Sequence, residues 1–325
     1  MMQATPLFPS MSATPPSPHQ CFTDLINRAR AYTPAPYAVV WPGEDHALLG
    51  PLDAAQQGII QPVLLGDEDC IHKIADKNRI DLQPYQIIHS KTPESAAQKA
   101  VELARTGHVH GLMKGSLHTD VLMHAVVAPE NGLCTGRRIS HVFLLAVPTY
   151  QNLLFVTDAA INIFPDLSTK RDIVQNAIDL HIGLGLGSPK VAILSAVEVI
   201  NPKIPSTLDA ASLCKMAERG QITGGTLDGP LGMDNAINPE AARIKGIASP
   251  VAGQAQILVT PDLESGNMLA KNLIFMAQAD SAGIAVGAKV PIVLTSRADS
   301  VQARLASAAI GALYSRYMVQ QAAAF

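Results

Sequence analysis

Short apolar runs alternate with helical stretches through the first half of the chain. The runs AVVWPG, PVLLGD, YQIIHS and HGLMKG are separated by segments with helical periodicity, such as PESAAQKAVELARTG. Strands that alternate with helices of about ten to fifteen residues indicate βαβ units and a parallel sheet. This half of the chain is therefore predicted to be an α/β unit with right-handed crossovers.

The pattern changes in the middle of the chain. Two apolar runs, HVFLLAVP and LLFVTDAA, flank the polar residues 149–152, which predicts an antiparallel hairpin. A helix follows with Ser168 as its expected N-cap, then a strand, a helix over about 206–219 and the Gly-rich crossing TGGTLDGPLGMDNAI. A mixed sheet in this half suits a two-domain α/β enzyme with a cleft between the halves.

Composition narrows the class of protein. The 325 residues predict about two domains, and 48% hydrophobic with 16% charged residues suits packed cores rather than disorder. A net charge of −3 gives no general attraction to nucleic acid or to anionic membranes, so an anionic ligand needs a local site. No apolar run approaches the ~18 residues of a membrane span.

The ends and the cysteines of the chain suggest a cytoplasmic protein. The proline-rich residues 1–20 carry no basic stretch followed by an apolar one, and we expect a flexible tail rather than a signal peptide. Four cysteines lie far apart without a C-x-x-C pair, which is typical of reduced thiols in a cytosolic protein. His108-Val109-His110 has no carboxylate or cysteine at ligand spacing, so we expect no metal.

Polar residues follow the last apolar run of the chain. In PIVLTSRADS, the run Ile292–Leu294 leads directly to Ser296, Arg297 and Asp299. Ligands of parallel α/β sheets bind beyond the carboxyl ends of the strands, so these side chains are candidates for ligand contact. The alternative is that Ser and Asp only cap the following helix.

The segment LMKGSLHTD has the same arrangement. An apolar strand ends at Lys114-Gly115, and Ser116 or Thr119 begins a helix. Free N–H groups at a helix start, together with a nearby ammonium, favour an anion. The alternative is a simple strand–helix turn.

Three further segments are ambiguous when each is read alone. TGRRISHVF places Arg138 and Ser140 before a strand, where forked guanidinium donors suit phosphate, although His141 can equally be a core residue. TLDGPLGMDNAI combines Asp228 with Gly229, which permits close backbone approach or a tight turn. ASPVAGQAQILVTPDLESGN contains a strand end and a helix start expected at residues 265–267.

Together these segments resemble the phosphate acetyltransferase/phosphate butyryltransferase (phosphotransacetylase) family. The resemblance runs from about Thr23 to the C-terminus, and KG-x-x-HT, RRISHV and SRADS are closer to the butyryltransferase branch. It implies an α/β protein with the two-domain isocitrate/isopropylmalate dehydrogenase-like fold, a mostly parallel sheet and an inserted second α/β domain. Family members are usually homodimers.

The resemblance also implies a division of the chain. We expect a tail at 1–20, a first domain at 21–145 plus 290–325, and a second domain inserted at 146–289. The last strand and helix return to the first domain, so that PIVLTSRADS faces the cleft.

The implied reaction is acyl-CoA + phosphate ⇌ acyl phosphate + CoA, with an acetyl, butyryl or other short acyl group. Coenzyme A is a substrate, and no permanently bound cofactor is expected. Arg297 carries over as the residue that clamps phosphate, and Ser296 as the donor to phosphate or to the developing oxyanion. The family's catalytic Asp aligns with Ala303, so the base is open between Asp299 and Asp228.

Substrate binding carries over less directly. The Arg-Pro of the acetyltransferase branch is replaced by Met123-His124, which removes one expected phosphate ligand. The residues expected to bind phosphate or CoA are Lys114, Gly115, His118, Thr119, Arg138, Ser140 and Gly229.

Two alternatives stay open on the sequence. The missing Asp and Arg favour a non-catalytic acyl-CoA-binding regulatory module of the same fold. A hydride-transferring dehydrogenase would need a carboxylate cluster for a divalent metal and a nucleotide site, and the sequence shows no such cluster.

Overall fold

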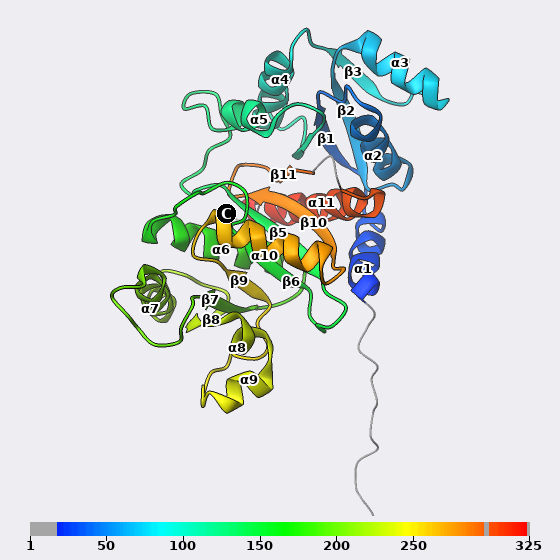
Figure 1. Ribbon diagram of the computed structural model, residues 1–325. Coiled ribbons are helices and arrows are strands. Elements are labelled where there is room, and N and C mark those ends of the chain that lie inside the picture. The colour runs from blue at the N-terminus through cyan, green and yellow to red at the C-terminus, as the bar shows by residue number, and fades with distance from the viewer. Residues whose placement is uncertain (1–17, 296–298, 324–325) are drawn as a thin grey trace, which may run out of the picture.

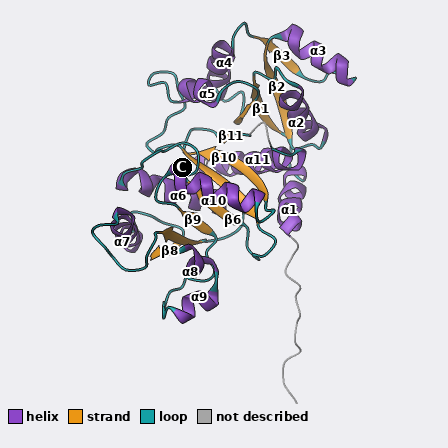
Figure 2. Ribbon diagram, in the orientation of Figure 1, coloured by secondary structure: helices purple, strands orange, loops and turns teal. Residues whose placement is uncertain are grey.

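One mixed sheet of eleven strands runs through the computed structural model, which describes residues 18–295 and 299–323 (Figure 1). The strand order is β3-β2-β1-β4-β11-β10-β5-β6-β9-β7-β8. Strand pairs are parallel except β11–β10, β10–β5 and β5–β6. Helices flank the sheet (Figure 2), so the predicted α/β class with a mostly parallel sheet is confirmed.

The first half of the chain alternates strands and helices as predicted. Its elements are α1 (Pro18–Arg30), β1 (Ala35–Val40), α2 (Asp45–Gln56), β2 (Ile60–Gly66), α3 (Glu68–Asn78), β3 (Gln86–His89), α4 (Pro93–Arg105), β4 (Gly111–Lys114) and α5 (Thr119–Val126). Helix α1 begins at Pro18, inside the segment expected to be a tail, and residues 1–17 lie outside the described part of the chain.

The strands of the second half vary from two to seven residues. Its elements are β5 (Ser140–Ala146), β6 (Leu154–Thr157), α6 (Leu167–Gly183), β7 (Lys190–Leu194), α7 (Pro205–Glu218), β8 (Thr226–Leu231), α8 (Met233–Ile237), α9 (Pro239–Ile244), β9 (Ile257–Val259), α10 (Leu263–Phe275), β10 (Asp280–Val286), β11 (Ile292–Val293) and α11 (Val301–Ala323). The β5–β6 hairpin is antiparallel, as predicted.

Strand β11 joins the two halves of the sheet. It runs parallel to β4 and antiparallel to β10, so the chain after residue 290 returns to the strands of the first half. Because the sheet is continuous across this junction, the domain boundaries at 145/146 and 289/290 stay predictions. Within the described ranges, no helix is long and apolar enough to cross a membrane.

Three local expectations were wrong. Asp166, rather than Ser168, caps α6, because its carboxylate reaches the Thr169 N–H at 2.7 Å. Helix α10 begins at Leu263, before the expected 265–267 start, because Asp262 and Ser265 form a capping box. Residues 226–231 form the edge strand β8 and no loop, since they pair with β7.

The buried residues form three clusters that define the two faces of the sheet. Side chains alternate between faces along a strand, and on every strand from β1 to β10 one set packs into the largest cluster with α1, α2, α3, α6, α7 and α11. The other set packs under α4 and α5 in the first half of the chain and under α8 and α10 in the second half. On that second face, a cleft lies between α10 and the start of α11, where residues of β10 and β5 and the residue after β11 line it.

Candidate active site

The floor of this cleft is made by outward positions of the three central strands. Leu294 follows β11, Ser281 belongs to β10 and Phe143 belongs to β5, and all three line a cavity. Gly283 and His141, at the same face of β10 and β5, are buried, and a Cβ on Gly283 would lie 3.0 Å from His141 Nε2. The floor is thus built where the two halves of the sheet meet.

A cavity of about 410 Å³, here called the cleft cavity, opens at one end of this floor. Helix α10 forms one wall with Asn267 and Lys271, and the start of α11 with the preceding Asp299 and Ser300 forms the other. Cavities of about 300–1,000 Å³ are typical of small-molecule sites. Asp299, one of the two candidate bases, therefore lies beside a space that can hold a ligand.

A second, narrow hollow lies at the carboxyl ends of β4 and β11, here called the strand-end hollow. Lys114, Gly115 and Thr295 line it together with His46 of α2 and Arg304 of α11. Its volume is about 10 Å³, close to the space that one water needs. The chain therefore brings the end of β4 to the end of β11.

Lys114 and Gly115 are held tightly in the turn between β4 and α5. The Lys114 ammonium donates to the carbonyls of Gly115 at 3.2 Å and Leu117 at 3.3 Å. Gly115 is required there, because a Cβ would lie 2.4 Å from the Trp41 carbonyl oxygen. The predicted binding residues His118 and Thr119 follow on the same turn, and both are exposed.

Arg304 is a residue of this site that the sequence analysis missed. It is 8% exposed, and its Nη1 donates to the His46 carbonyl at 3.4 Å. Gly50 of α2 makes room for it, since a Cβ there would lie 3.2 Å from Arg304 Cδ. A guanidinium inside the otherwise apolar segment ARLASAAIGALY was the available signal.

His141 and Asp158 form a buried polar pair beside the cleft floor. Asp158 accepts backbone N–H groups from Ala160, Ile161 and Asn162 at 2.9–3.2 Å, and the Asn162 side-chain amide at 2.6 Å. Burial lowers the pKa of His141 to about 4, although the Asp158 carboxylate acts in the opposite direction. His141 is therefore neutral at pH 7, and within the described residues its Nδ1 makes no hydrogen bond.

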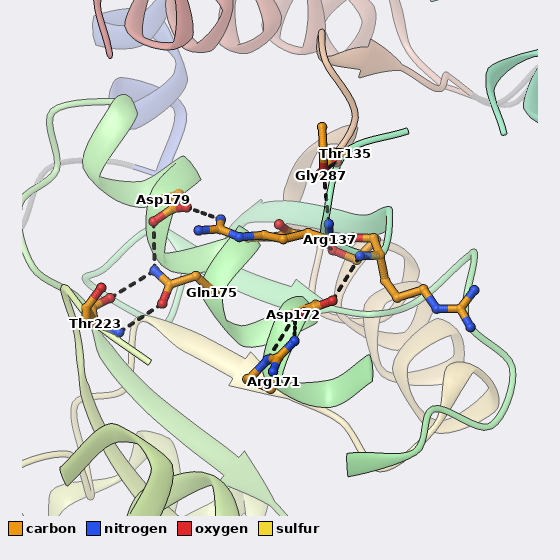
Figure 3. A network of polar contacts seen from close by, with 11 residues as sticks. Thr135, Arg137, Arg171, Asp172, Gln175, Asp179, Thr223 and Gly287 are labelled. Atoms are coloured by element: carbon orange, nitrogen blue, oxygen red, sulfur yellow. Dashed lines mark hydrogen bonds and ion pairs between the residues drawn. The ribbon is translucent and has the colours of Figure 1, made fainter. Parts of the chain in front are cut away.

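The two arginines before β5 do not reach this cleft. Arg137 pairs with Asp179 of α6, which also accepts from Gln175 at 2.8 Å (Figure 3). The Arg138 N–H donates to Asp172 at 3.0 Å. Hydrogen bonds from Thr169 and Ser168 lower the pKa of Asp166, at the start of α6, to about 2, and the positive charge of Arg138 adds to this effect.

Ser140 also lies apart from the cleft. It is fully buried on the opposite face of the sheet, where its hydroxyl accepts from Asn176 at 3.0 Å. The structure therefore does not bring Ser140 to Lys114, because alternation along β5 directs Ser140 into the core under α6. The binding role expected of Arg138 stays a prediction.

Asp228 and Gly229 lie in the edge strand β8, six strand positions from β11. At about 4.8 Å between neighbouring strands, this separation is about 29 Å along the sheet. Gly229 is needed because a Cβ would lie 2.7 Å from the Ile193 carbonyl oxygen. Asp228 therefore lies in a strand and not on the expected loop, and close packing on β7 explains the glycine beside it. The role of Asp228 as a base stays a prediction.

Ser296 and Arg297, the residues expected to contact phosphate, lie outside the described residues. Their neighbours Thr295 and Asp299 line the strand-end hollow and the cleft cavity, respectively. Across residues 18–295 and 299–323, no group of three His, Cys, Asp or Glu side chains could hold a metal ion.

Comparison with known proteins identifies the family of this chain. A family model described as "Phosphate acetyl/butaryl transferase" matches residues 91–312. The chain is 62% identical over 290 residues to a phosphate acetyltransferase of Rhizobium meliloti, covering 89% of this chain and 92% of the relative. It is 42% identical over 292 residues to a phosphate butyryltransferase of Clostridium acetobutylicum, covering 90% and 97%.

A solved structure agrees with these relatives. The branched-chain phosphotransacylase from Enterococcus faecalis V583 superposes with a TM-score of 0.75 at 30% identity, covering 86% of this chain and 99% of that one. Because the family model matches more than half of the chain and the relatives align over nearly all of it, the chain belongs to the phosphate acetyltransferase and phosphate butyryltransferase family and is a phosphate acyltransferase.

Proposed function

We propose that the chain transfers a short acyl group between coenzyme A and inorganic phosphate, with phosphate at the ends of β4 and β11 and the thioester at the cleft cavity. The observation that carries this site is the meeting of the β4 and β11 ends, where Lys114 and the buried Arg304 lie beside Thr295. Two cationic side chains at one place offset the negative charge of phosphate. The net charge of the chain, −3, does not attract an anion, so such a local site is needed.

The strand-end hollow is too small for phosphate, so we propose that phosphate binds at its mouth. Arg297 lies two residues beyond Thr295, and a guanidinium there can bind two phosphate oxygens through its forked donors. Ser296 donates to phosphate or to the carbonyl oxygen that becomes negative during attack. His118 and Thr119 lie on the exposed turn after Lys114, where they can reach the same anion.

The chemistry proceeds through one tetrahedral intermediate. A phosphate oxygen attacks the thioester carbonyl, the C–S bond breaks and CoA leaves as a thiolate that takes up a proton. In reverse, the thiol must lose its proton before it attacks acyl phosphate, because a thiol of pKa ~8.5 is only a few per cent ionised at neutral pH. We propose Asp299 as the group that exchanges this proton, since it lines the cleft cavity.

The choice of base gives a direct prediction. We expect Asp299→Asn to lower kcat by about 10²–10⁴-fold and to flatten the pH–rate profile, the usual contribution of a positioned base. Asp228→Asn is the matched control, because its carboxylate lies on the edge strand β8. A flattened profile in Asp228→Asn with a normal one in Asp299→Asn would reverse the assignment.

The overall reaction is tested by following CoA release from acetyl-CoA with a thiol reagent. We expect release to require phosphate and acyl phosphate to appear in equal amount as its hydroxamate. Acyl-CoA binding without turnover would instead fit the regulatory module of the same fold, whereas the relatives named above are transferases.

We further propose that the chain is a cytoplasmic homodimer. Large apolar side chains of the second half are exposed: Ile163, Phe164, Val199, Ile200 and Leu208. They lie before α6 and around the start of α7, two helices that pack together. A second copy of the chain would cover them, and the free cysteines suit a reducing compartment.

A further inference from the structure

Part of the lining of the cleft cavity is apolar, which neither phosphate nor the thiol requires. Polar groups also line it, and the part formed by Lys271 on α10 and by Asp299 and Ser300 before α11 is here called the rim. The apolar residues of the lining include Phe22, Phe143, Leu294, Ala303 and Ala306. Such a lining binds hydrocarbon better than it binds charge.

Helix α11 supplies the smallest residues of this lining. Ala303 and Ala306 are three positions apart and therefore lie on one face of the helix. They are 7% and 1% exposed, so each methyl group forms part of a closed wall. A larger side chain at either position would extend into the cavity.

The aromatic ring of Phe143 forms the opposite side. It is half-buried on the cleft floor and lies edge-on to His141, with ring centroids 4.5 Å apart. Phe22 of α1 closes the end behind the alanines and is 1% exposed. The lining is thus polar near Asp299 and apolar between Phe143 and α11, and this apolar part is here called the dry end.

We propose that this dry end receives the alkyl tail of the acyl group, and that Ala303 and Ala306 set the longest chain that the enzyme accepts. The proposal rests on the function given above, because it places the thioester carbonyl at the rim beside Asp299. A volume of about 410 Å³ exceeds what an acetyl group fills, so the site takes acyl chains longer than acetyl.

The test compares kcat/KM for acetyl-, propionyl- and butyryl-CoA at saturating phosphate. We expect the wild-type chain to use all three. In Ala303→Val and Ala306→Val, the ratio of kcat/KM for butyryl-CoA to that for acetyl-CoA should fall about tenfold or more, since one methylene in an apolar pocket changes this ratio by about 10–200-fold. Phe143→Ala enlarges the dry end and should raise the ratio of kcat/KM for butyryl-CoA to that for acetyl-CoA. This variant tests the proposal even if a valine variant fails to fold.

The control is Ala322→Val, which makes the same change on the exposed last turn of α11 and should leave the ratio as in wild type. An unchanged ratio in both folded valine variants, or a wild-type chain that uses acetyl-CoA alone, would overturn the acyl pocket while leaving the acyltransferase intact. Absence of phosphate-dependent CoA release with every acyl-CoA would instead refute the proposed function, and this pocket with it.

Discussion

At the scale of single residues, the burial of His141 makes the stability of the fold depend on pH. Its native pKa of about 4 lies below the ordinary 6.5 because the ring is buried. The unfolded chain therefore takes up a proton at a higher pH than the native one, and the stability that neutral His141 maintains is lost as pH falls from 6.5 towards 4. We expect the free energy of unfolding to fall by about 2 kcal/mol more in wild type than in His141→Gln between pH 7.5 and 5.

Urea unfolding at the two pH values measures this difference. His72→Gln is the control, because it makes the same substitution at a side chain that is about half exposed on α3. Equal pH dependence in wild type and His141→Gln would show that the His141 ring is solvated in the native enzyme.

At the scale of elements, helix α10 forms one wall of the cleft, and a capping box defines where this helix begins. Asp262 accepts the Ser265 N–H at 2.8 Å, and Asn267 donates to the Ala159 carbonyl at 3.0 Å, which ties the helix to the loop after β6. We expect Asp262→Ala to lower the free energy of unfolding by about 1 kcal/mol, the usual cost of losing an N-cap. Thermal or urea unfolding provides the value.

The matched change is Glu264→Ala, in the first turn of the same helix but exposed and outside the capping box. Its effect should be clearly smaller, within the ~0.3–1 kcal/mol of a charge near a helix end. Equal losses in the two variants would mean that charge, and not the cap, defines the start of α10.

At the scale of the whole molecule, the order of strands explains what the sequence could predict. Local patterns identified the βαβ units, the β5–β6 hairpin and the strand ends at Lys114 and Thr295, because periodicity and turn residues are local signals. Sheet order is not local. Nothing in TLDGPLGMDNAI indicates that it forms the edge strand, so Asp228 was expected on a loop and lies in β8 instead.

The same distinction applies to the site. Alternation along β5 makes neighbours face opposite sides, so RRISHV divides between the α6 face and the cleft, with Ser140 on one and His141 on the other. Arg304 was missed because the apolar composition of α11 predicts that this helix is buried, but does not predict which other helix packs against it. Its partner α2 lies more than 250 residues earlier in the chain.

The proposed dimer is also a property of the whole molecule. We expect Phe164→Asp with Ile200→Asp to convert a dimer into a monomer, since two buried charges without partners oppose association. Sedimentation velocity measures the change, and Met276→Asp, an equally exposed residue at the end of α10, is the control. A monomeric wild-type chain, or a dimer that survives both charges, would refute this interface.

The central claim is that phosphate binds where the ends of β4 and β11 meet, and Lys114→Met tests it most directly. The change removes one charge and keeps the length of the side chain, so the KM for phosphate should rise about 10–100-fold, as for a lost charged hydrogen bond, while the KM for acyl-CoA changes little. Lys245→Met, on the surface ion pairs with Glu198 and Asp234, should leave both constants as in wild type. An unchanged phosphate KM in a folded Lys114→Met enzyme would contradict the account.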